Sequence, residues 1–189
     1  MPVRKVEREL LRKCRAGDWE AYEAVVRAYE PRVYSLALGL VRDPDDARDM
    51  TQETFIRAFQ AMDLYDPDRP FLGWVLGICR NRCIDFLRQV RHPVRLDRER
   101  DGRKPQLPDP GSRSDGEASD GELRTLIWEA LGRIGEEHRE VLVLKDMQGL
   151  EYAEIARILN IPQGTVASRV YYARRSLKET LESMGVSYP

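Results

Sequence analysis

Trp74, Asn81 and Arg88 are spaced by seven residues in the segment between Pro70 and Val90. Seven residues are close to two turns of an α-helix, so on a helix these side chains share one face. An indole exposed to water makes few favourable contacts. Stacking on an unpaired nucleic-acid base contributes about 1–3 kcal/mol to binding, and a nearby arginine can hold the phosphate backbone. The spacing therefore predicts a platform for single-stranded DNA. The alternative is that Trp74 packs under a neighbouring loop.

The charge of the same segment favours the nucleic-acid interpretation. From Arg80 to Arg95 there are five arginines and one aspartate, and we take Arg80 and Arg91 as further phosphate contacts. Arg82 lies on the predicted core face, so we expect it to pair with an acid or to extend its charged end to the surface. The residues expected in the core of this helix are Phe71, Val75, Ile78, Cys79 and Phe86.

A second candidate surface lies near the C-terminus. Tyr152–Leu159 has the pattern of a short amphipathic helix, Asn160 and Pro162 form a turn, and another helix begins near Gln163, which together predict a helix-turn-helix. The stripe expected to pack inward is Val166, Val170, Ala173 and Leu177. The expected DNA contacts are Thr165, Ser168, Arg169, Tyr171, Tyr172, Arg174, Arg175 and Lys178. The window 163–178 holds four basic residues and no acid, which favours DNA binding. The alternative interpretation is an ordinary helical hairpin whose basic face is solvated.

An acidic stretch separates the start of the chain from the tryptophan-bearing helix. Between Asp43 and Asp68 there are eight acids and two arginines, so this surface repels DNA and suits a basic protein partner or solubility. The inward residues of its helix are expected to be Thr51, Phe55, Ala58, Phe59 and Met62. The outward residues, which we predict to meet a protein, are Asp46, Asp49, Met50, Gln52, Glu53, Ile56 and Gln60.

The elements that position these residues are helices. No alternating β-branched run or hairpin turn is present, so we predict an all-α fold. Gly17-Asp18 predicts a helix end and a new N-cap, Pro31 suits a first helical turn, and Asp43 is another cap. Further helices are expected at about 44–62, 70–90, 122–134 and 136–148.

Residues 93–121 are rich in Pro, Gly, Asp, Ser and Arg and have no aromatic residue, which predicts a flexible linker. The chain is therefore expected to consist of two small helical domains, 1–92 and 122–189, joined by that tether. A flexible tether lets both domains bind at once and raises the effective concentration of each.

Composition excludes several classes of protein. The net charge is −1, no apolar run reaches the roughly 18 residues of a membrane span, and the N-terminus has no secretory pattern, so we expect a cytoplasmic protein without membrane insertion. No catalytic grouping or phosphate-binding glycine loop is present, and we expect no enzyme activity and no cofactor. Cys79 and Cys83 can bind metal with Cys14 or His92, but two buried thiols and no metal is the favoured interpretation.

Two motifs resemble a known family. DARDMTQETFIRAFQ followed by FLGWVLGICRNRCIDFLR, and then HREVLVLKDMQGLEYAEIARILNIPQGTVASRVYYARRSLK after a charged linker, resemble the extracytoplasmic-function (ECF) group of bacterial sigma factors. The resemblance covers about residues 21–181, with only the linker unmatched, and the motifs occur in the family's order and spacing.

The resemblance implies a sigma region two in the first domain and a sigma region four in the second. Asp49–Phe55 would bind the β′ clamp coiled coil of core RNA polymerase, and the helix of Trp74 would melt the promoter and read its minus-ten element. The preceding loop would hold a flipped base, with Leu64, Tyr65, Asp66 and Arg69 as its candidate residues. The second domain would read the minus-thirty-five element and contact the β flap, and an anti-sigma protein would mask both domains.

The alternative function is a stand-alone helix-turn-helix regulator that binds duplex operators, which leaves the acidic helix and Trp74 unexplained. The sequence also departs from the family. Ala167 and Tyr172 stand where a basic residue is common, so we expect the groove contacts to be fewer or more aromatic. Glu151 replaces the usual Ser or Thr cap.

Overall fold

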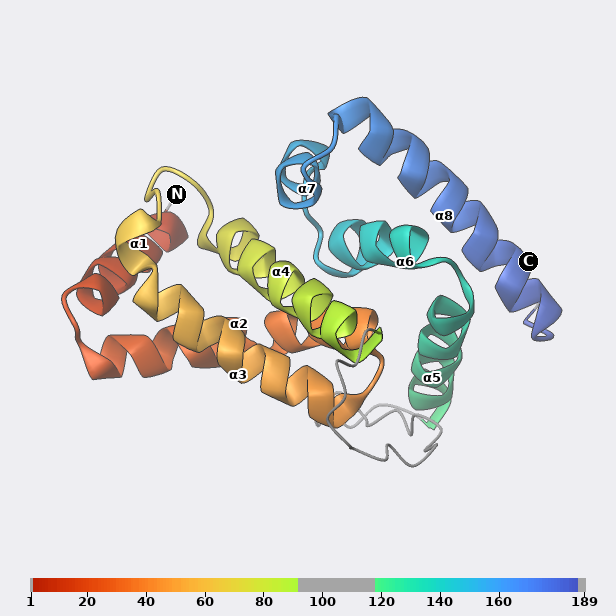
Figure 1. The fold of residues 1–189 in the computed structure, drawn as a ribbon, viewed down its shortest axis with the longest axis horizontal. Helices are drawn as coiled ribbons and strands as arrows, with labels where there is room; N and C mark the ends of the chain where they lie inside the picture. Colours follow the sequence, from red (N-terminus) through yellow and green to blue (C-terminus); the bar gives the residue numbers. More distant parts are fainter. Residues whose placement is uncertain (1, 92–117, 187–189) are drawn as a thin grey trace.

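Helices account for all the regular structure that the computed structural model describes, which covers residues 2–91 and 118–186 (Figure 1). The elements are α1 (Pro2–Arg15), α2 (Trp19–Val41), α3 (Pro44–Gln60), a 3₁₀ turn η1 (Met62–Leu64), α4 (Phe71–Arg91), α5 (Ala118–Arg133), α6 (Glu136–Leu142), a π-helical turn η2 (Val143–Met147), α7 (Tyr152–Leu159) and α8 (Gln163–Ser183). The all-α prediction is confirmed.

Two aspartates start the helices of the first unit as the sequence predicts. The Asp18 carboxylate accepts a hydrogen bond from the Ala21 N–H at 3.1 Å. The Asp43 carboxylate accepts from the N–H groups of Asp45 and Asp46, both at 2.9 Å. These bonds satisfy amides that have no partner inside the helix, which fixes where α2 and α3 begin.

Three boundaries differ from expectation. Pro31 lies inside α2 rather than at the start of a helix, because Val33 and Leu36 behind it are fully buried and their burial offsets the lost backbone bond. Helix α5 begins at Ala118, so the last four residues of the predicted linker are helical. The helix expected over 136–148 changes to π-helical geometry at Val143. The rest of the predicted linker, up to residue 117, lies outside the described residues.

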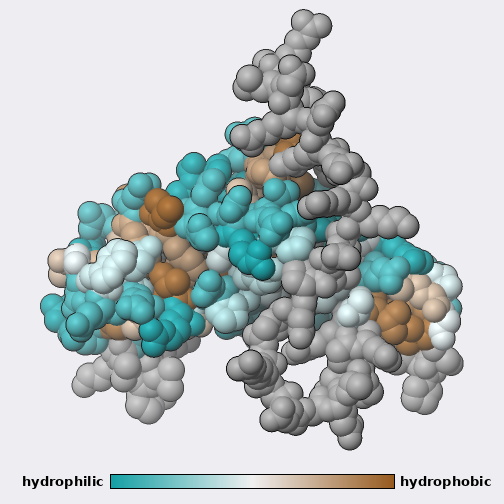
Figure 2. All heavy atoms as spheres, turned by 90° about the horizontal axis from the view of Figure 1, so that it is seen from below, coloured by the Kyte–Doolittle hydropathy of each residue, from teal (hydrophilic) through white to brown (hydrophobic). Residues whose placement is uncertain are grey.

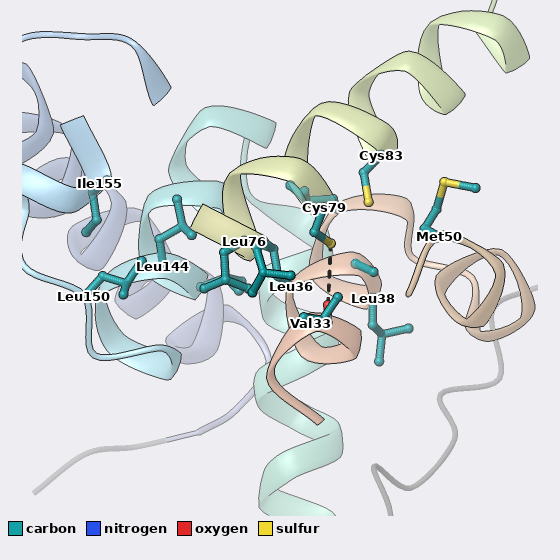
Figure 3. Packing of buried hydrophobic residues seen from close by; sticks show 14 of the residues in the cluster. Val33, Leu36, Leu38, Met50, Leu76, Cys79, Cys83, Leu144, Leu150 and Ile155 are labelled. Atoms are coloured by element: carbon teal, nitrogen blue, oxygen red, sulfur yellow. Dashed lines mark hydrogen bonds between the residues drawn. The ribbon is translucent and has the colours of Figure 1, made fainter. Parts of the chain in front are cut away.

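Helix α2 is the centre of the packing: α3 and α4 cover it on one side, and α6 approaches it from the second unit. One cluster of buried apolar residues runs from the first unit into the second, and Figure 3 shows Leu36 and Leu76 of the first unit beside Leu144 of the second. Of the core residues predicted on α4, Phe71, Val75 and Cys79 are fully buried, whereas Ile78 and Phe86 are only partly buried.

The surface is mostly hydrophilic on the face seen in Figure 2, with separate apolar patches on both units. No helix among the described residues is long and apolar enough to cross a membrane.

Candidate nucleic-acid interface

Trp74 is half-buried rather than exposed. Its ring packs at 5.2 Å from the Tyr65 ring and at 5.6 Å from the Phe71 ring, so it does pack against the loop that precedes α4. It also lines a cleft of about 320 Å³ together with Gly77 and Asn81. The indole is thus supported by neighbouring rings and still borders an open cavity, which suits a stacking platform.

The cations of α4 differ in what they bind. Arg80 forms an ion pair with Glu140 of α6 at 2.6 Å, and its side chain is 23% exposed. Arg82 pairs with Glu53 of α3, which confirms one of the two expectations for that residue. Arg88 is 75% exposed and lies 3.9 Å from Asp85. The side chain of Arg91 lies outside the described residues.

The loop before α4 is held at its base by Tyr65. The Tyr65 hydroxyl donates a hydrogen bond to the Arg69 carbonyl at 2.6 Å, and burial raises the pKa of Tyr65 to about 12. Asp66 and Arg69 form an exposed ion pair at 3.1 Å. Leu64 is 82% exposed. The segment 65–69 is therefore closed by a hydrogen bond, and Leu64, the last residue of η1, is an exposed apolar side chain directly before it.

The outward face predicted for α3 is exposed or partly exposed, except at Met50. Asp49, Gln52, Ile56 and Gln60 are exposed, and Asp46 and Glu53 are partly exposed. Met50 was expected outside but is only 3% exposed. The reason is that α3 packs against both α2 and α4, so its buried arc is wider than a single stripe and includes Met50, which lies near Cys83 in Figure 3.

An aromatic stack beside α3 was missed by sequence reasoning. Trp19 is 71% exposed and stacks on Tyr22 with 4.7 Å between ring centroids, and Tyr22 contacts Phe59 of α3. Phe59 lies one turn from the exposed Ile56. The signal available in the sequence was the pair of aromatic residues in the first turn of α2, directly after its cap.

Helices α7 and α8 form the predicted helix-turn-helix. Asn160 adopts the left-handed conformation with φ of 54°, and the Ile161 N–H donates to the Ala156 carbonyl at 3.1 Å. The Glu154 carboxylate accepts from the Glu151 N–H at 2.9 Å, so α7 has a cap interaction although no Ser or Thr precedes it. Val166, Val170 and Ala173 are buried and Leu177 is partly buried, as expected.

The opposite face of α8 is open. Tyr171 and Tyr172 are 66% and 56% exposed, and Ser168 is exposed with its hydroxyl donating to the Thr165 carbonyl at 3.0 Å. Thr165 and Arg169 are partly buried. This surface is accessible to a partner along most of the helix.

Each of the four cations of α8 has an acidic partner, so the local positive charge is smaller than the sequence window suggested. Arg169 pairs with Glu137 at 3.1 Å and Arg174 with Asp146. The exposed pairs within α8 are Arg175 with Glu179 at 2.9 Å and Lys178 with Glu182 at 3.7 Å. Glu179 and Glu182 lie beyond the end of the window 163–178, and Glu137 and Asp146 lie on other elements, so a count over that window includes none of these acids. Exposed pairs of this kind contribute little to stability.

The thiols are buried as predicted. Cys79 and Cys83 are fully buried, and a hydrogen bond with Cys79 together with burial raises the pKa of Cys83. Among the described residues there is no group of three or more His, Cys, Asp or Glu placed to hold a metal ion.

Comparison with known proteins identifies the family. Residues 25–92 match the Sigma-70 region 2 family model and residues 124–177 match Sigma-70, region 4. The chain is 30% identical to the ECF RNA polymerase sigma factor SigW of Bacillus subtilis (strain 168), in an alignment covering 92% of this chain and 96% of SigW. The chain belongs to the ECF group of RNA polymerase sigma factors.

Solved structures agree with this assignment. CnrH, solved in complex with the cytosolic domain of CnrY, is 26% identical with a TM-score of 0.68, and the match covers 93% of this chain and 97% of CnrH. RpoE from Bartonella quintana, solved with the anti-sigma factor NepR, shares the fold with a TM-score of 0.69 and 24% identity over 85% of this chain and 96% of RpoE.

ECF sigma factors are transcription initiation factors, not enzymes, and this chain directs RNA polymerase to promoters through regions 2 and 4. In this sigma factor region 2 runs from within α2 through α4, and region 4 from α5 into α8. A stand-alone operator-binding regulator does not account for the region 2 match.

Proposed function

We propose that this sigma factor divides its work among three surfaces: α3 binds core RNA polymerase, α4 and its preceding loop bind the melted minus-ten element, and α8 binds the duplex minus-thirty-five element. The observation that carries the proposal is the separation of charge and rings. Exposed acids lie on α3. The indole of Trp74, supported by neighbouring rings, lies on α4, and the exposed tyrosines lie on α8.

The α3 surface suits a basic protein groove. Asp49 and Gln52 are exposed polar groups, and Ile56 is 52% exposed beside them, so the patch combines charge with apolar area as protein interfaces do. We propose that it contacts the β′ clamp coiled coil, with Asp46, Glu53 and Gln60 at its edges, and that region 4 contacts the β flap. Met50, being buried, supports the surface from beneath.

The α4 surface suits unpaired bases. Unstacking a base costs a few kcal/mol, and an aromatic platform recovers part of that cost. Trp74 would stack on one base, Asn81 in the same cleft would hydrogen-bond to another, and Arg88 would hold the backbone. Leu64 and the ring of Tyr65 would bound the pocket for a flipped base.

The α8 surface suits the major groove. Ser168 near the N-terminal end can reach base edges, and the small Gly164 allows close approach. Tyr171, Tyr172, Arg175 and Lys178 are exposed farther along, where phosphates would lie.

We also propose an anti-sigma partner and a cytoplasmic location. RpoE of Bartonella quintana was solved with the anti-sigma factor NepR, and CnrH with the cytosolic domain of CnrY. The shared fold makes a protein that covers both regions a reasonable partner for this chain.

In vitro transcription tests the proposal. Core RNA polymerase with the purified chain and genomic DNA should initiate at discrete start sites that core enzyme alone does not use. The protein alone should bind duplex DNA weakly in a gel shift. High affinity for the promoter requires α4 and α8 to bind DNA at the same time, and polymerase holds them in place to do so. Transcription from random positions, or tight duplex binding without polymerase, would contradict it.

A further inference from the structure

Helix α1 precedes the residues that either family model matches. The match to Sigma-70 region 2 begins at residue 25, within α2, whereas α1 ends at Arg15. The helix packs on α2 and on η1, which leads into the loop before α4 (Figure 1). Helix α1 therefore lies against segment 63–69, which contains the residues proposed to bind a flipped base.

Two arginines of α1 bind the two ends of this segment. Near its start, the Arg15 guanidinium donates to the Asp63 carboxylate at 2.8 Å and to the Asp63 carbonyl at 3.1 Å. Near its end, the Arg8 guanidinium donates to the Asp68 carboxylate at 3.1 Å. Both contacts join residues far apart in the chain, and both come from the same helix. One element therefore holds the segment at both ends.

The helix also sets the spacing between these ends. Arg8 and Arg15 are seven residues apart, so they lie on one face of α1 about two turns and about 10 Å from each other. A free chain of five residues, as from Asp63 to Asp68, can extend to about 17 Å. Leu11 lies between the two arginines, is 4% exposed, and lines a small cavity of about 40 Å³ together with Tyr65. The segment is thus held to a length shorter than its reach, against a buried leucine.

A third contact links α1 to the rings behind the segment. The Tyr29 hydroxyl of α2 donates to the Glu7 carboxylate. The Tyr29 ring lies 5.0 Å from the Phe71 ring, and the Phe71 ring lies 5.4 Å from the ring of Tyr65 and 5.6 Å from that of Trp74. Helix α1 therefore supports, through Tyr29, the same ring cluster that supports the proposed stacking platform.

The two arginine pairs act locally rather than on the stability of the whole unit. The side chains of Arg8 and Asp68 are 55% and 86% exposed, and those of Arg15 and Asp63 are 49% and 84% exposed. Exposed pairs contribute little to the free energy of unfolding. A short surface segment opens at a much smaller cost than global unfolding, so contacts at both its ends change how often it is ordered. A binding pocket with ordered walls loses less entropy when it takes its ligand.

We propose that α1 is the positioning element of the flipped-base pocket, and that Arg8 and Arg15 are positioning residues that act on the pocket through Asp68 and Asp63. The proposal rests on the proposed role of segment 63–69 in binding DNA. Neither arginine is assigned a contact with the base, so their effect on DNA comes from the order of the segment alone.

The test uses the full-length chain and variants matched in charge. Arg8→Gln combined with Arg15→Gln removes both tethers. The control is Arg12→Gln combined with Lys13→Gln, which removes two exposed cations from the same helix, where Arg12 pairs with Glu9 of α1 itself. Circular dichroism and thermal unfolding verify that both variants are folded.

A charge exchange tests the pair with Asp68 separately. Asp68→Arg places two cations together, and adding Arg8→Asp restores an ion pair of reversed polarity. A role that depends on this contact is rescued by the exchange, whereas a loss of local structure for any other reason is not.

Amide hydrogen exchange measures the order of the segment without DNA. The N–H groups of Leu64, Tyr65 and Arg69 are bonded to carbonyls within residues 61–66, so their exchange reports on opening of the segment. These amides should exchange about threefold faster in the double glutamine variant, the effect of losing two exposed pairs, and at the parent rate in the control. The charge exchange should slow them relative to Asp68→Arg alone. Unchanged exchange in the folded double glutamine variant would overturn the proposal.

Binding of holoenzyme to DNA with single abasic sites measures the effect on base capture. The probe is a fork DNA whose single-stranded part carries the minus-ten region of a promoter mapped by in vitro transcription. In the parent, the position of the captured base should show the largest loss of affinity when that base is removed. The double glutamine variant should show a loss about threefold smaller at this position, and the control should show the parent loss.

The two readouts separate the tether from the role of the segment. Faster amide exchange together with the parent loss at the abasic position would overturn the proposal, because the order of the segment would not affect base capture. If removal of no single base reduced binding by the parent, the base-binding role of segment 63–69 would be refuted, and the proposal with it.

Discussion

Arg82 of α4 donates two hydrogen bonds to a single carboxylate oxygen of Glu53 on α3. The Arg82 side chain is 15% exposed, whereas the Glu53 side chain is 44% exposed. The contact joins the helix proposed to bind DNA to the helix proposed to bind polymerase. The two helices are therefore joined by a charged hydrogen-bonded pair in addition to apolar packing.

Arg82→Ala should lower the free energy of unfolding of region 2 by about 1–3 kcal/mol, because it removes charged hydrogen bonds from a mostly buried site. Arg48→Ala is the control, since Arg48 pairs with Asp45 at a site where the side chains are 59% and 89% exposed. That change should cost no more than about 0.5 kcal/mol. Urea unfolding followed by circular dichroism measures both, and equal losses would contradict a structural role for Arg82.

Trp74→Ala should leave binding to core polymerase intact and reduce promoter opening. The loss of one stacked base is worth about 1–3 kcal/mol, which is about 5- to 150-fold in the fraction opened. Permanganate footprinting of unpaired thymines measures this fraction. Trp74→Phe is the control, since a smaller ring retains stacking and the contacts with Tyr65 and Phe71. Normal opening by the alanine variant would remove the stacking role.

Local rules predicted the helices well. Asp18, Asp43 and Asn160 act through bonds or backbone conformations within a few residues of themselves, and all three lie where the sequence placed them. The helix-turn-helix was predictable for the same reason. The burial of Val166 and Val170 follows from helical periodicity, which needs no knowledge of the partner helix.

Contacts between distant segments were not predictable. Met50 is buried because two helices cover α3, and Pro31 is tolerated because α2 is central to the packing. The partners of Arg80 and Arg169 lie on α6, far along the chain, so a charge count over a window treats both as free cations. These features depend on how helices are arranged in space, which no local pattern specifies.

Asp49→Arg combined with Gln52→Arg should abolish association with core polymerase while leaving region 2 folded. Both side chains are exposed, so the change cancels the negative charge of the α3 surface without disturbing its packing. Glu53 is left unchanged, because an arginine there would repel the buried Arg82 and unfold the helix pair. Pull-down with core enzyme is the measurement, and retention of binding by the folded double variant would place the polymerase contact elsewhere.

Arg175→Ala should weaken binding of holoenzyme to promoter duplex and reduce the slope of log affinity against log salt by about 0.9, the value for one lost phosphate contact. Glu179→Gln should do the opposite and raise affinity, because it frees the Arg175 guanidinium from its exposed partner. Arg133→Ala is the control, since Arg133 forms a similar exposed pair on α5. Identical salt slopes for Arg175→Ala and the control would show that Arg175 does not contact phosphate.

The free energy of unfolding should fall as the pH rises above 9, in part because of Cys14. Burial raises the pKa of this thiol from 9.0 to about 11. In the unfolded chain the thiol loses its proton near pH 9, whereas in the folded chain it keeps the proton until about pH 11. Between these pH values the unfolded state binds fewer protons, so a rise in pH favours the unfolded state. Cys14→Ala should therefore show a shallower decline than the parent in urea unfolding between pH 8 and about pH 9.5, below the range where buried tyrosines titrate. Equal slopes for the parent and the variant would mean that the folded thiol titrates as an exposed one does, and that the packing of α1 on α2 does not shield it from water.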